Sequence, residues 1–386
     1  MSIEVFLTEQ QRRLAREVLS WAKTVLYPDP GNEEDPNGEG LRLLAKMAEA
    51  GWLRYTVPAA HGGAEQPLQS RSLAVIRDAL SRGSSLADTM FALQGLGSYP
   101  ITLAGTDAQR KRFLPPVAAG ESVAAFALTE PEAGSDIGAI QTRAEKKGDR
   151  YILNGTKCFI SNAGIANLYL VFASTSPADG AKGLSAFVVE GSAPGLVLKE
   201  QTALVAPHPN GTIAFENCAV DHRQRLGEEG QGIKIALTTL DKFRPTVGAA
   251  ACGLACRALE EAIAYSQKRK QFGNTLASYQ AIQFKLAEMA TRLDASRLLV
   301  FRAAHAGDTV PGRSTLESAM AKLHATEAAQ WIIDQAVQIH GGQGVRAGSA
   351  VERLYREVRG LRIYEGTSEI QHLVIARELL KKYGSQ

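Results

Sequence analysis

The chain has 386 residues, of which 45% are hydrophobic and 22% are charged, and its formal net charge is +3. This length and composition allow a large core spread over two or three domains, and the nearly balanced charge gives no sign of a nucleic-acid partner. The N-terminus lacks a basic region followed by an apolar stretch, and no apolar run approaches the roughly 20 residues that a membrane span needs. We therefore expect no secretory signal, no membrane segment and a cytoplasmic location.

Cysteine and histidine give no indication of a metal site. Cys252 and Cys256 lie on one face of a predicted helix, and Cys158 and Cys218 are isolated in the sequence. We interpret all four as buried thiols in a reducing compartment. The histidines are scattered without the spacing of a metal motif, so we predict no metal site.

Residues 1–120 have the periodicity of helices. The segment from Thr8 to Gln11 has the form of a capping box, and apolar residues follow it at helical spacing. Pro115, Pro116 and Gly120 are expected to end this helical part. We predict an N-terminal all-helical domain over 1–120, with further helices over residues 41–50, 68–81 and 86–103.

The pattern changes at Glu121 to short runs rich in aromatic and β-branched residues. Glycines and Asn-Gly pairs, such as Asn154-Gly155 and Asn210-Gly211, are expected to form the turns between them. We predict a β domain over 121–226, built as a small barrel or sandwich. Its expected strands cover residues 122–128, 151–154, 168–174, 184–190 and 212–217.

From Gly232 onward the helical period returns. Residues 233–270 form one long helix or two helices divided at Pro245, because proline lacks the N–H that a helix interior needs. We predict a C-terminal four-helix bundle over 227–386, with its other helices over 278–307, 314–340 and 367–382. The whole chain is then an α+β multidomain protein in the order helical domain, β domain, helical bundle.

A carboxylate stands directly before a glycine in Tyr364-Glu365-Gly366-Thr367-Ser368-Glu369. Thr367 or Ser368 can cap the last helix, whose free amides and dipole favour an anion or a polarised carbonyl nearby. Aromatic and aliphatic neighbours can raise the pKa of Glu365 by desolvation, as a general base requires. A solvated glutamate before a capped helix is the alternative.

Two further stretches lie at the border of the β domain. Phe126-Ala127-Leu128-Thr129-Glu130-Pro131-Glu132-Ala133-Gly134-Ser135-Asp136 joins a strand to a loop that carries glycine, hydroxyl groups and free amides. Such a loop can meet the polar edge of a planar heterocycle, although an ordinary Pro-Gly turn has a similar composition. In Asn154-Gly155-Thr156-Lys157-Cys158-Phe159-Ile160-Ser161-Asn162, an aromatic residue is followed by a hydroxyl residue two positions on.

Together with four C-terminal motifs, these stretches resemble the acyl-CoA dehydrogenase family over essentially the whole chain. The C-terminal motifs are Arg269-Lys270-Gln271-Phe272-Gly273, Tyr279-Gln280-Ala281-Ile282-Gln283, Gln338-Ile339-His340-Gly341-Gly342-Gln343-Gly344 and the stretch from Tyr364 to Ser368 described above. The resemblance implies an FAD cofactor between the β domain and the bundle. It also implies a homotetramer built as a dimer of dimers.

The resemblance also implies which residues contact FAD. The backbone of Phe126 to Thr129 meets the pyrimidine edge, Phe159 packs on the isoalloxazine, and Ser161 meets the flavin N5. Residues of the first three C-terminal motifs reach the FAD of a neighbouring subunit, where Arg269 answers the charge of the diphosphate. The full implied set is Phe126, Leu128, Thr129, Gly134, Ser135, Phe159, Ile160, Ser161, Arg269, Gln271, Phe272, Gln280, Gln338, Gly341, Gly342, Thr367 and Glu369.

By the same resemblance, Glu365 takes the α-proton of an acyl-CoA thioester while the β-hydrogen leaves as hydride to the flavin. Electrons then pass to an electron-transfer flavoprotein. One subgroup of the family places its base on the long helix, but the matching residue here, Phe243, cannot take a proton. The residues implied to line the thioester and its pantetheine arm are Ser135, Asp241, Arg244 and Gly366.

Three departures from the family pattern bear on the substrate. Residues 203–210 replace a basic, glycine-containing segment, and His208 in that loop is either a structural histidine or a polar contact. Phe243 adds bulk that would favour a short, branched or cyclic acyl group, and Glu369 replaces the more usual glutamine. Two other enzymes stay open, a dehydrogenase of a carrier-protein-bound acyl thioester and a flavin acyl oxidase. The near-neutral charge argues against a DNA-binding relative.

Overall fold

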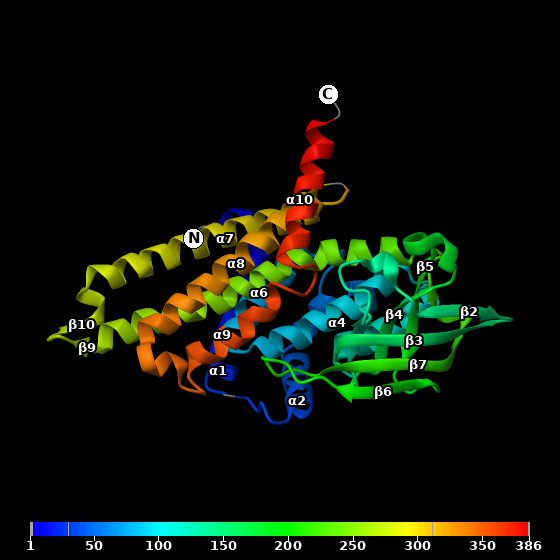
Figure 1. Ribbon diagram of the computed structural model, residues 1–386, viewed down its shortest axis with the longest axis horizontal. Coiled ribbons are helices and arrows are strands. Elements are labelled where there is room, and N and C mark those ends of the chain that lie inside the picture. Colours follow the sequence, from blue (N-terminus) through cyan, green and yellow to red (C-terminus); the bar gives the residue numbers. More distant parts are fainter. Residues whose placement is uncertain (1–2, 30, 311, 385–386) are drawn as a thin grey trace. The chain divides into compact units, whose positions relative to one another are not determined.

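The structure is a computed structural model that describes residues 3–29, 31–310 and 312–384 (Figure 1). Its contacts divide the chain into two compact units. The first unit holds Met1–Pro30, Gln69–Asp88 and Arg244–Gln386, and the second holds Gly31–Leu68 and Thr89–Phe243. Helices, then strands, then helices follow one another along the chain, which confirms the predicted α+β class. The domain boundaries at residues 120 and 226 stay a prediction.

The first unit is built from helices, and a polar cap begins α1 (Glu9–Val25), α9 (Ala350–Leu361) and α10 (Ser368–Tyr383). Thr8 accepts a hydrogen bond from the Gln11 N–H at 3.3 Å, and the Gln11 side chain accepts one from the Thr8 N–H at 3.1 Å. This confirms the predicted capping box, which satisfies two otherwise free amides of the first turn. The other helices of this unit are α3 (Ser70–Gly83), α7 (Gln280–Thr309) and α8 (Thr315–His340), together with the part of α6 (Gly232–Lys268) that begins at Arg244.

Helix α6 (Gly232–Lys268) is continuous through Pro245, so the undivided alternative is confirmed. Its glycines allow neighbouring helices to pack closely. A Cβ at Gly253 would lie 2.3 Å from the Asp78 carbonyl oxygen of α3, and a Cβ at Gly248 would lie 2.7 Å from Val300 of α7. Helices α7 and α8 pack against each other in turn (Figure 1). The prediction of four bundle helices missed α9, because its sequence is short and strongly charged.

The second unit is organised around one sheet in the order β6-β7-β3-β2-β4-β5-β8, with β1 parallel to β4. Every residue of β4 is buried, as its unbroken apolar run predicts. Strands β3 and β7 are antiparallel, and their register places Ser161 opposite Asn210. The strands are β1 (Ala124–Ala127), β2 (Arg143–Lys147), β3 (Arg150–Ser161), β4 (Leu168–Ser174), β5 (Leu184–Glu190), β6 (Leu196–Gln201), β7 (Asn210–Asp221) and β8 (Arg225–Leu226).

The two Asn-Gly pairs are not the turns that the sequence predicts. Asn154-Gly155 lies inside β3, and Asn210-Gly211 begins β7. The β3–β7 register shifts between Leu153 and Gly155, so this glycine, at φ +150°, marks a bulge that bends a long strand. Strands β2, β6 and β8 were not predicted, because β2 and β6 are polar edge-like sequences and β8 is very short.

Helices α2 (Pro36–Glu49), α5 (Asp107–Ala119) and most of α4 (Ser85–Ala104) complete the second unit. Of the three residues expected to end the helical part, Gly120 is confirmed, since α5 ends at Ala119 and Gly120 follows with φ +75°. Pro115 and Pro116 do not end it, because both lie inside α5. Proline has a helical φ, and burial of the flanking side chains offsets the lost hydrogen bonds. The core combines the sheet with these helices and includes Ile101, Phe113, Leu114, Val117, Leu168, Leu170, Phe172, Val188 and Ile235.

Within the described part of the chain, no helix is long and apolar enough to cross a membrane. The same residues contain no group of three histidine, cysteine or acidic side chains that could hold a metal ion. All four cysteines are buried free thiols, as predicted. Burial raises the pKa of the Cys218 thiol to about 11, which keeps it protonated and unreactive.

Candidate active site

Glu365 sits on a strained turn that joins α9 to α10. Its φ is +53°, in the left-handed region, and Gly366 follows at φ +93°. A side chain in this region costs about 1–3 kcal/mol and persists only where the surroundings hold it. A Cβ at position 366 would lie 2.4 Å from Gln371 Nε2, so the turn requires the glycine.

Side chains from three helices of the first unit hold this turn by its carbonyl groups. Arg244 Nε of α6 donates to the Glu365 carbonyl at 3.3 Å, and Lys322 Nζ of α8 donates to the Gly366 carbonyl at 2.8 Å. Gln371 Nε2 of α10 donates to the Gly366 carbonyl at 2.9 Å and to the Glu365 carbonyl at 3.4 Å. Lys322 and Gln371 have no exposed surface. Sequence analysis missed both, because neither belongs to a local motif.

Burial removes water from one oxygen of the Glu365 carboxyl. Its Oε2 is buried and, among the described residues, has no hydrogen-bond partner. Burial raises the pKa of this carboxyl, although the positive charges of Arg77, Arg244 and Lys322 act in the opposite direction. Arg77 makes two hydrogen bonds of 2.8 Å to Asp88, whose negative charge offsets that of the guanidinium. A raised pKa and an oxygen without a hydrogen-bond partner among the described residues are the properties that a general base needs.

Helix α10 begins beside this carboxyl, and its cap is Thr367. The Thr367 hydroxyl accepts from the Ile370 N–H at 3.3 Å, which decides between the two predicted caps. Ser368 instead hydrogen-bonds Glu327, which also accepts from Arg362 Nε at 2.8 Å. Glu369 is exposed in the first turn, and a hydrogen bond from its own backbone N–H lowers its pKa.

The other predicted cofactor residues of the first unit are exposed. Strands β9 (Lys270–Gln271) and β10 (Asn274–Thr275) form a hairpin, and Tyr279 Oη donates to the Gln271 carbonyl at 2.6 Å. At its tip, Phe272 has φ +49° and is 94% exposed. An exposed aromatic residue on a strained turn indicates a contact surface. The remaining exposed candidates are Arg269, Gln271, Gln280, Gln338, Gly341 and Gly342.

In the second unit, a buried ion pair holds the loop that follows β1. Lys157 Nζ donates to the Leu128 carbonyl at 3.0 Å and to Glu130 Oε1 at 2.7 Å, and both charged side chains are buried. Glu130 also accepts from the backbone N–H groups of Gln141 and Thr142. These bonds lower the pKa of Glu130 against the effect of its burial. Sequence analysis missed this pair, although Glu130 and Lys157 lie inside the two motifs.

The end of β3 presents an aromatic ring and a hydroxyl group. Phe159 has φ +54° and is 62% exposed, while its neighbour Ile160 is buried. Ser161 is half-buried, and its Oγ lies 3.2 Å from Nε2 of His208. The Cys158 N–H donates to the Thr129 carbonyl at 3.0 Å, so the Leu128–Thr129 loop and the end of β3 lie together.

The remaining predicted residues of the second unit divide by burial. Phe126 is half-buried on β1, and Gly134 and Ser135 are exposed on the following loop. Asp241 is buried, and so is Arg244 in the first unit. Phe243 has no exposed surface, and its ring meets that of Tyr99 at 6.0 Å in an edge-on arrangement. Phe243 is therefore a packed core residue, consistent with the prediction that the base lies elsewhere.

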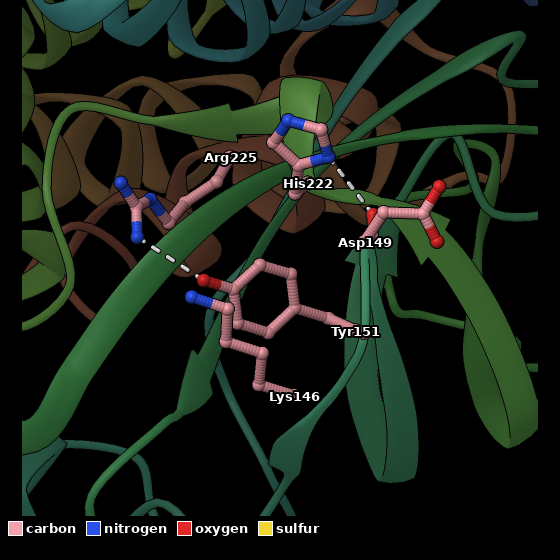
Figure 2. Close-up of a pocket in the computed structure, with 6 residues that line it drawn as sticks. Lys146, Asp149, Tyr151, His222 and Arg225 are labelled. Carbon is pink, nitrogen blue, oxygen red and sulfur yellow. Dashed lines mark hydrogen bonds between the residues drawn. The ribbon is translucent and has the colours of Figure 1, made fainter.

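A small hollow of about 240 Å³ lies at the opposite end of β3 (Figure 2). It is lined by Lys146, Gly148, Asp149, Tyr151, His222 and Arg225. Arg225 donates to Tyr151 Oη at 3.1 Å, and His222 lies 2.9 Å from the Asp149 carbonyl. The length of β3, at about 3.3 Å per residue, separates this hollow from Ser161 by roughly 35 Å. The Arg225 and His222 contacts pair four of the lining residues with one another, and Lys146 pairs with Glu229 at 4.0 Å, so we assign the hollow a structural role.

Three family models cover the chain. The acyl-CoA dehydrogenase N-terminal domain matches residues 8–121, the middle domain matches 125–218, and the C-terminal domain matches 230–380. A 3-(aryl)acrylate reductase of Clostridium sporogenes is 40% identical over 98% of this chain and 100% of its own length. An acyl-CoA dehydrogenase of Bacillus subtilis is 38% identical over 97% of this chain and 99% of its own.

Solved structures agree with these matches. One similar chain was solved in a study of the electron transferring flavoprotein of Acidaminococcus fermentans and of flavin-based electron bifurcation. Its fold matches that of this protein with a TM-score of 0.92. It is 37% identical, over 97% of this chain and 99% of that one. An acyl-CoA dehydrogenase of Bacillus anthracis complexed with FAD has a TM-score of 0.90 and is 31% identical, over 98% of this chain and 68% of that one. A prolyl acyl carrier protein oxidase has a TM-score of 0.89 and is 32% identical, over 97% and 99%.

The fold and the sequence matches define a flavin-dependent oxidoreductase. The chain belongs to the acyl-CoA dehydrogenase family, whose members depend on FAD. The side chains present fit that cofactor, because Phe159 and Phe272 expose aromatic surface from strained backbone. Glu365 Oε2 is buried and has no partner among the described residues, so it can accept a hydrogen bond or a proton from a ligand.

Proposed function

We propose that this enzyme oxidises an acyl-CoA thioester to the trans-2-enoyl thioester and that Glu365 removes the α-proton. The observation that carries the proposal is the Glu365 Oε2 atom, which is buried and has no hydrogen-bond partner among the described residues, together with the raised pKa of this carboxyl. A carboxylate in water is too weak a base for this proton. Desolvation makes the carboxylate more basic and narrows the difference in acidity between the two groups.

The developing negative charge on the thioester oxygen also needs hydrogen-bond donors. We assign one of them to the backbone N–H of Glu365. The turn that carries this group is fixed by Arg244, Lys322 and Gln371, which bind its carbonyl groups before any substrate arrives. A donor fixed in advance needs no reorganisation during the reaction, which is the main source of such stabilisation.

When FAD is bound, it accepts the β-hydrogen as hydride, and the protein positions the reacting groups. We assign the Leu128–Thr129 backbone to the polar edge of the flavin, the Phe159 ring to its face and the Ser161 hydroxyl to its N5. The exposed hairpin and the end of α8 would then serve the cofactor of a neighbouring subunit. We propose that the enzyme is a homotetramer built as a dimer of dimers, in which these residues meet the FAD of the neighbouring subunit. The exposure of these residues in a single chain supports this assignment.

The electron acceptor that we propose is an electron-transfer flavoprotein, and the location that we propose is the cytoplasm. The similarity to a chain from the Acidaminococcus fermentans work supports this partner. Phe243 and the loop at residues 203–210 differ from the family pattern and are the positions where we expect acyl selectivity to be set. Phe243 has no exposed surface, so its effect on selectivity would act through the residues packed around it.

A carrier-bound acyl thioester is the second candidate substrate, and an acyl oxidase is the second candidate activity. The similarity to a prolyl acyl carrier protein oxidase supports both the second substrate and the second activity as candidates. The same site can also run in reverse, because the group that removes a proton in one direction returns it in the other. The similarity to an enzyme named for acrylate reduction makes that direction worth measuring.

The test is anaerobic bleaching of the bound flavin by a panel of acyl groups, each presented as the CoA ester and on a phosphopantetheinyl carrier protein. We expect bleaching by a short or branched CoA ester and reoxidation by the matching enoyl ester. Bleaching by the carrier ester alone would select the second substrate. Peroxide release at full turnover in air would select the oxidase. A purified protein that takes up no FAD would contradict all of these.

A further inference from the structure

The imidazole of His208 contacts the Ser161 side chain from the loop that precedes β7. Ser161 Oγ lies 3.2 Å from His208 Nε2, and His208 Nδ1 lies 3.3 Å from the Ala206 carbonyl oxygen. Asn210 Nδ2 lies at longer range from both, 3.5 Å from Ser161 Oγ and 3.4 Å from His208 Nε2. All four residues belong to the second unit.

These contacts decide the tautomer of the imidazole. A carbonyl oxygen only accepts hydrogen bonds, so Nδ1 carries the hydrogen and donates it to Ala206. Burial lowers the pKa of His208, so the ring is neutral near pH 7 and its Nε2 is an acceptor. The Ser161 hydroxyl therefore donates to His208 Nε2. Its oxygen accepts from Asn210 Nδ2 at 3.5 Å and keeps a second lone pair for a ligand.

The direction of this hydrogen bond matters because flavin N5 changes its character on reduction. In the oxidised ring N5 is an acceptor, and in the reduced ring it carries a hydrogen and is a donor. A hydroxyl group that meets oxidised N5 must donate to it, and then cannot donate to His208. A hydroxyl group that meets reduced N5 accepts from it, and its own hydrogen needs another acceptor.

We propose that His208 is a positioning residue that favours the reduced flavin. This proposal rests on the proposed function, which places Ser161 at the flavin N5. His208 accepts the Ser161 hydroxyl hydrogen when N5 becomes a donor, so the serine meets both redox states by turning about one bond. No other change in the protein is required.

The test is the midpoint potential of the bound FAD in variants of His208 and Ser161, measured by equilibration with a reference dye. Replacing His208 with Leu removes the acceptor and should lower the equilibrium constant for flavin reduction roughly tenfold, the size of one neutral hydrogen bond. For a two-electron couple this corresponds to about 30 mV. His208→Gln retains an acceptor at the position of Nε2 and should stay near the wild-type potential.

Ser161→Ala supplies the matched background. In Ser161→Ala, the further change His208→Leu should leave the potential unchanged, because no hydroxyl remains to be oriented. An equal shift in both backgrounds, or no shift in His208→Leu with FAD bound, would overturn the inference. If His208→Leu loses FAD, His208→Asn, whose amide is too short to reach Ser161, takes its place in the same comparison.

A second measurement needs no cofactor. Nitrogen NMR of the FAD-free protein should show a neutral His208 with hydrogen on Nδ1, and the Nε2 resonance should move in Ser161→Ala. Hydrogen on Nε2 would overturn the inference while leaving the proposed function intact. A wild-type protein that takes up no FAD would instead contradict the proposed function.

Discussion

Replacing Lys157 with Met breaks a buried ion pair whose loss can be sized from its surroundings. The Lys157 and Glu130 side chains are 0% and 5% exposed, and their charged atoms lie 2.7 Å apart. The variant leaves the Glu130 carboxylate buried without its cation, a change that costs about 3–5 kcal/mol of unfolding free energy. It also removes the donor to the Leu128 carbonyl, so we expect weaker FAD binding.

The assay is urea unfolding followed by the fluorescence of the chain, with FAD affinity measured by titration of the folded variant. Lys199→Met is the matched control, because Lys199 pairs with Glu216 at the surface, where the two side chains are 48% and 54% exposed. An exposed pair of this kind contributes about 0–1 kcal/mol. Adding Glu130→Gln to Lys157→Met removes the buried charge and should recover part of the lost stability.

The test compares the loss of unfolding free energy in Lys157→Met with the loss in Lys199→Met. If Lys157→Met cost no more than Lys199→Met, the pair would not be desolvated in the folded protein and the reasoning would be refuted. If stability fell as expected but FAD affinity stayed at the wild-type value, the pair would stabilise the β domain without positioning the cofactor loop.

Three further predictions concern the first unit. The raised pKa of Glu365 keeps its carboxyl protonated to higher pH than the ordinary value of 4.5, and the base must be ionised. The single-turnover rate of flavin reduction should therefore rise with pH along a limb above 4.5, and a limb at or below that value would contradict the burial argument. Lys322→Met removes a cation that lowers the pKa of Glu365, so the same rate profile should shift to higher pH, whereas Lys381→Met, on α10, should leave it in place. Arg77→Met leaves Asp88 buried without its partner and should lower the free energy of unfolding by about 3–5 kcal/mol, with partial recovery on adding Asp88→Asn; a loss below about 1 kcal/mol in denaturant titration would refute this.

The sequence predicted those helices and strands that depend on residues close to one another in the chain. The capping box at Thr8 and the apolar runs of β4 and β5 each depend on residues close in sequence, and the structure confirms them. The signals at Pro115 and at Asn154-Gly155 misled, because tertiary packing outweighs them. Pro115 lies inside a helix, and Asn154-Gly155 lies inside a strand that β2 and β7 flank. The sequence left open whether Pro245 divides its helix, and the structure shows that the helix is continuous there.

In the candidate site, too, the residues that belong to a contiguous motif were predicted and the others were not. Glu365 and Gly366 were found because a carboxylate before a glycine and a helix cap is a contiguous motif. Lys322 and Gln371 were not found, because a buried lysine in an apolar helix and a glutamine in the last helix become informative only when the fold places them on the Glu365–Gly366 carbonyl groups. His208 was noted in the sequence, but its contact with Ser161 depends on the β3–β7 register.

The measurement that tests the central claim most directly is anaerobic single-turnover reduction of the flavin by substrate in Glu365→Gln. Glutamine keeps the size of the side chain and cannot take a proton, so the account predicts a normal bound-FAD spectrum and a reduction rate lower by roughly 10²–10⁴-fold. Glu378→Gln, an equal change of charge on α10, should reduce at the wild-type rate. Near-wild-type reduction in Glu365→Gln would show that another group takes the α-proton and would contradict the account.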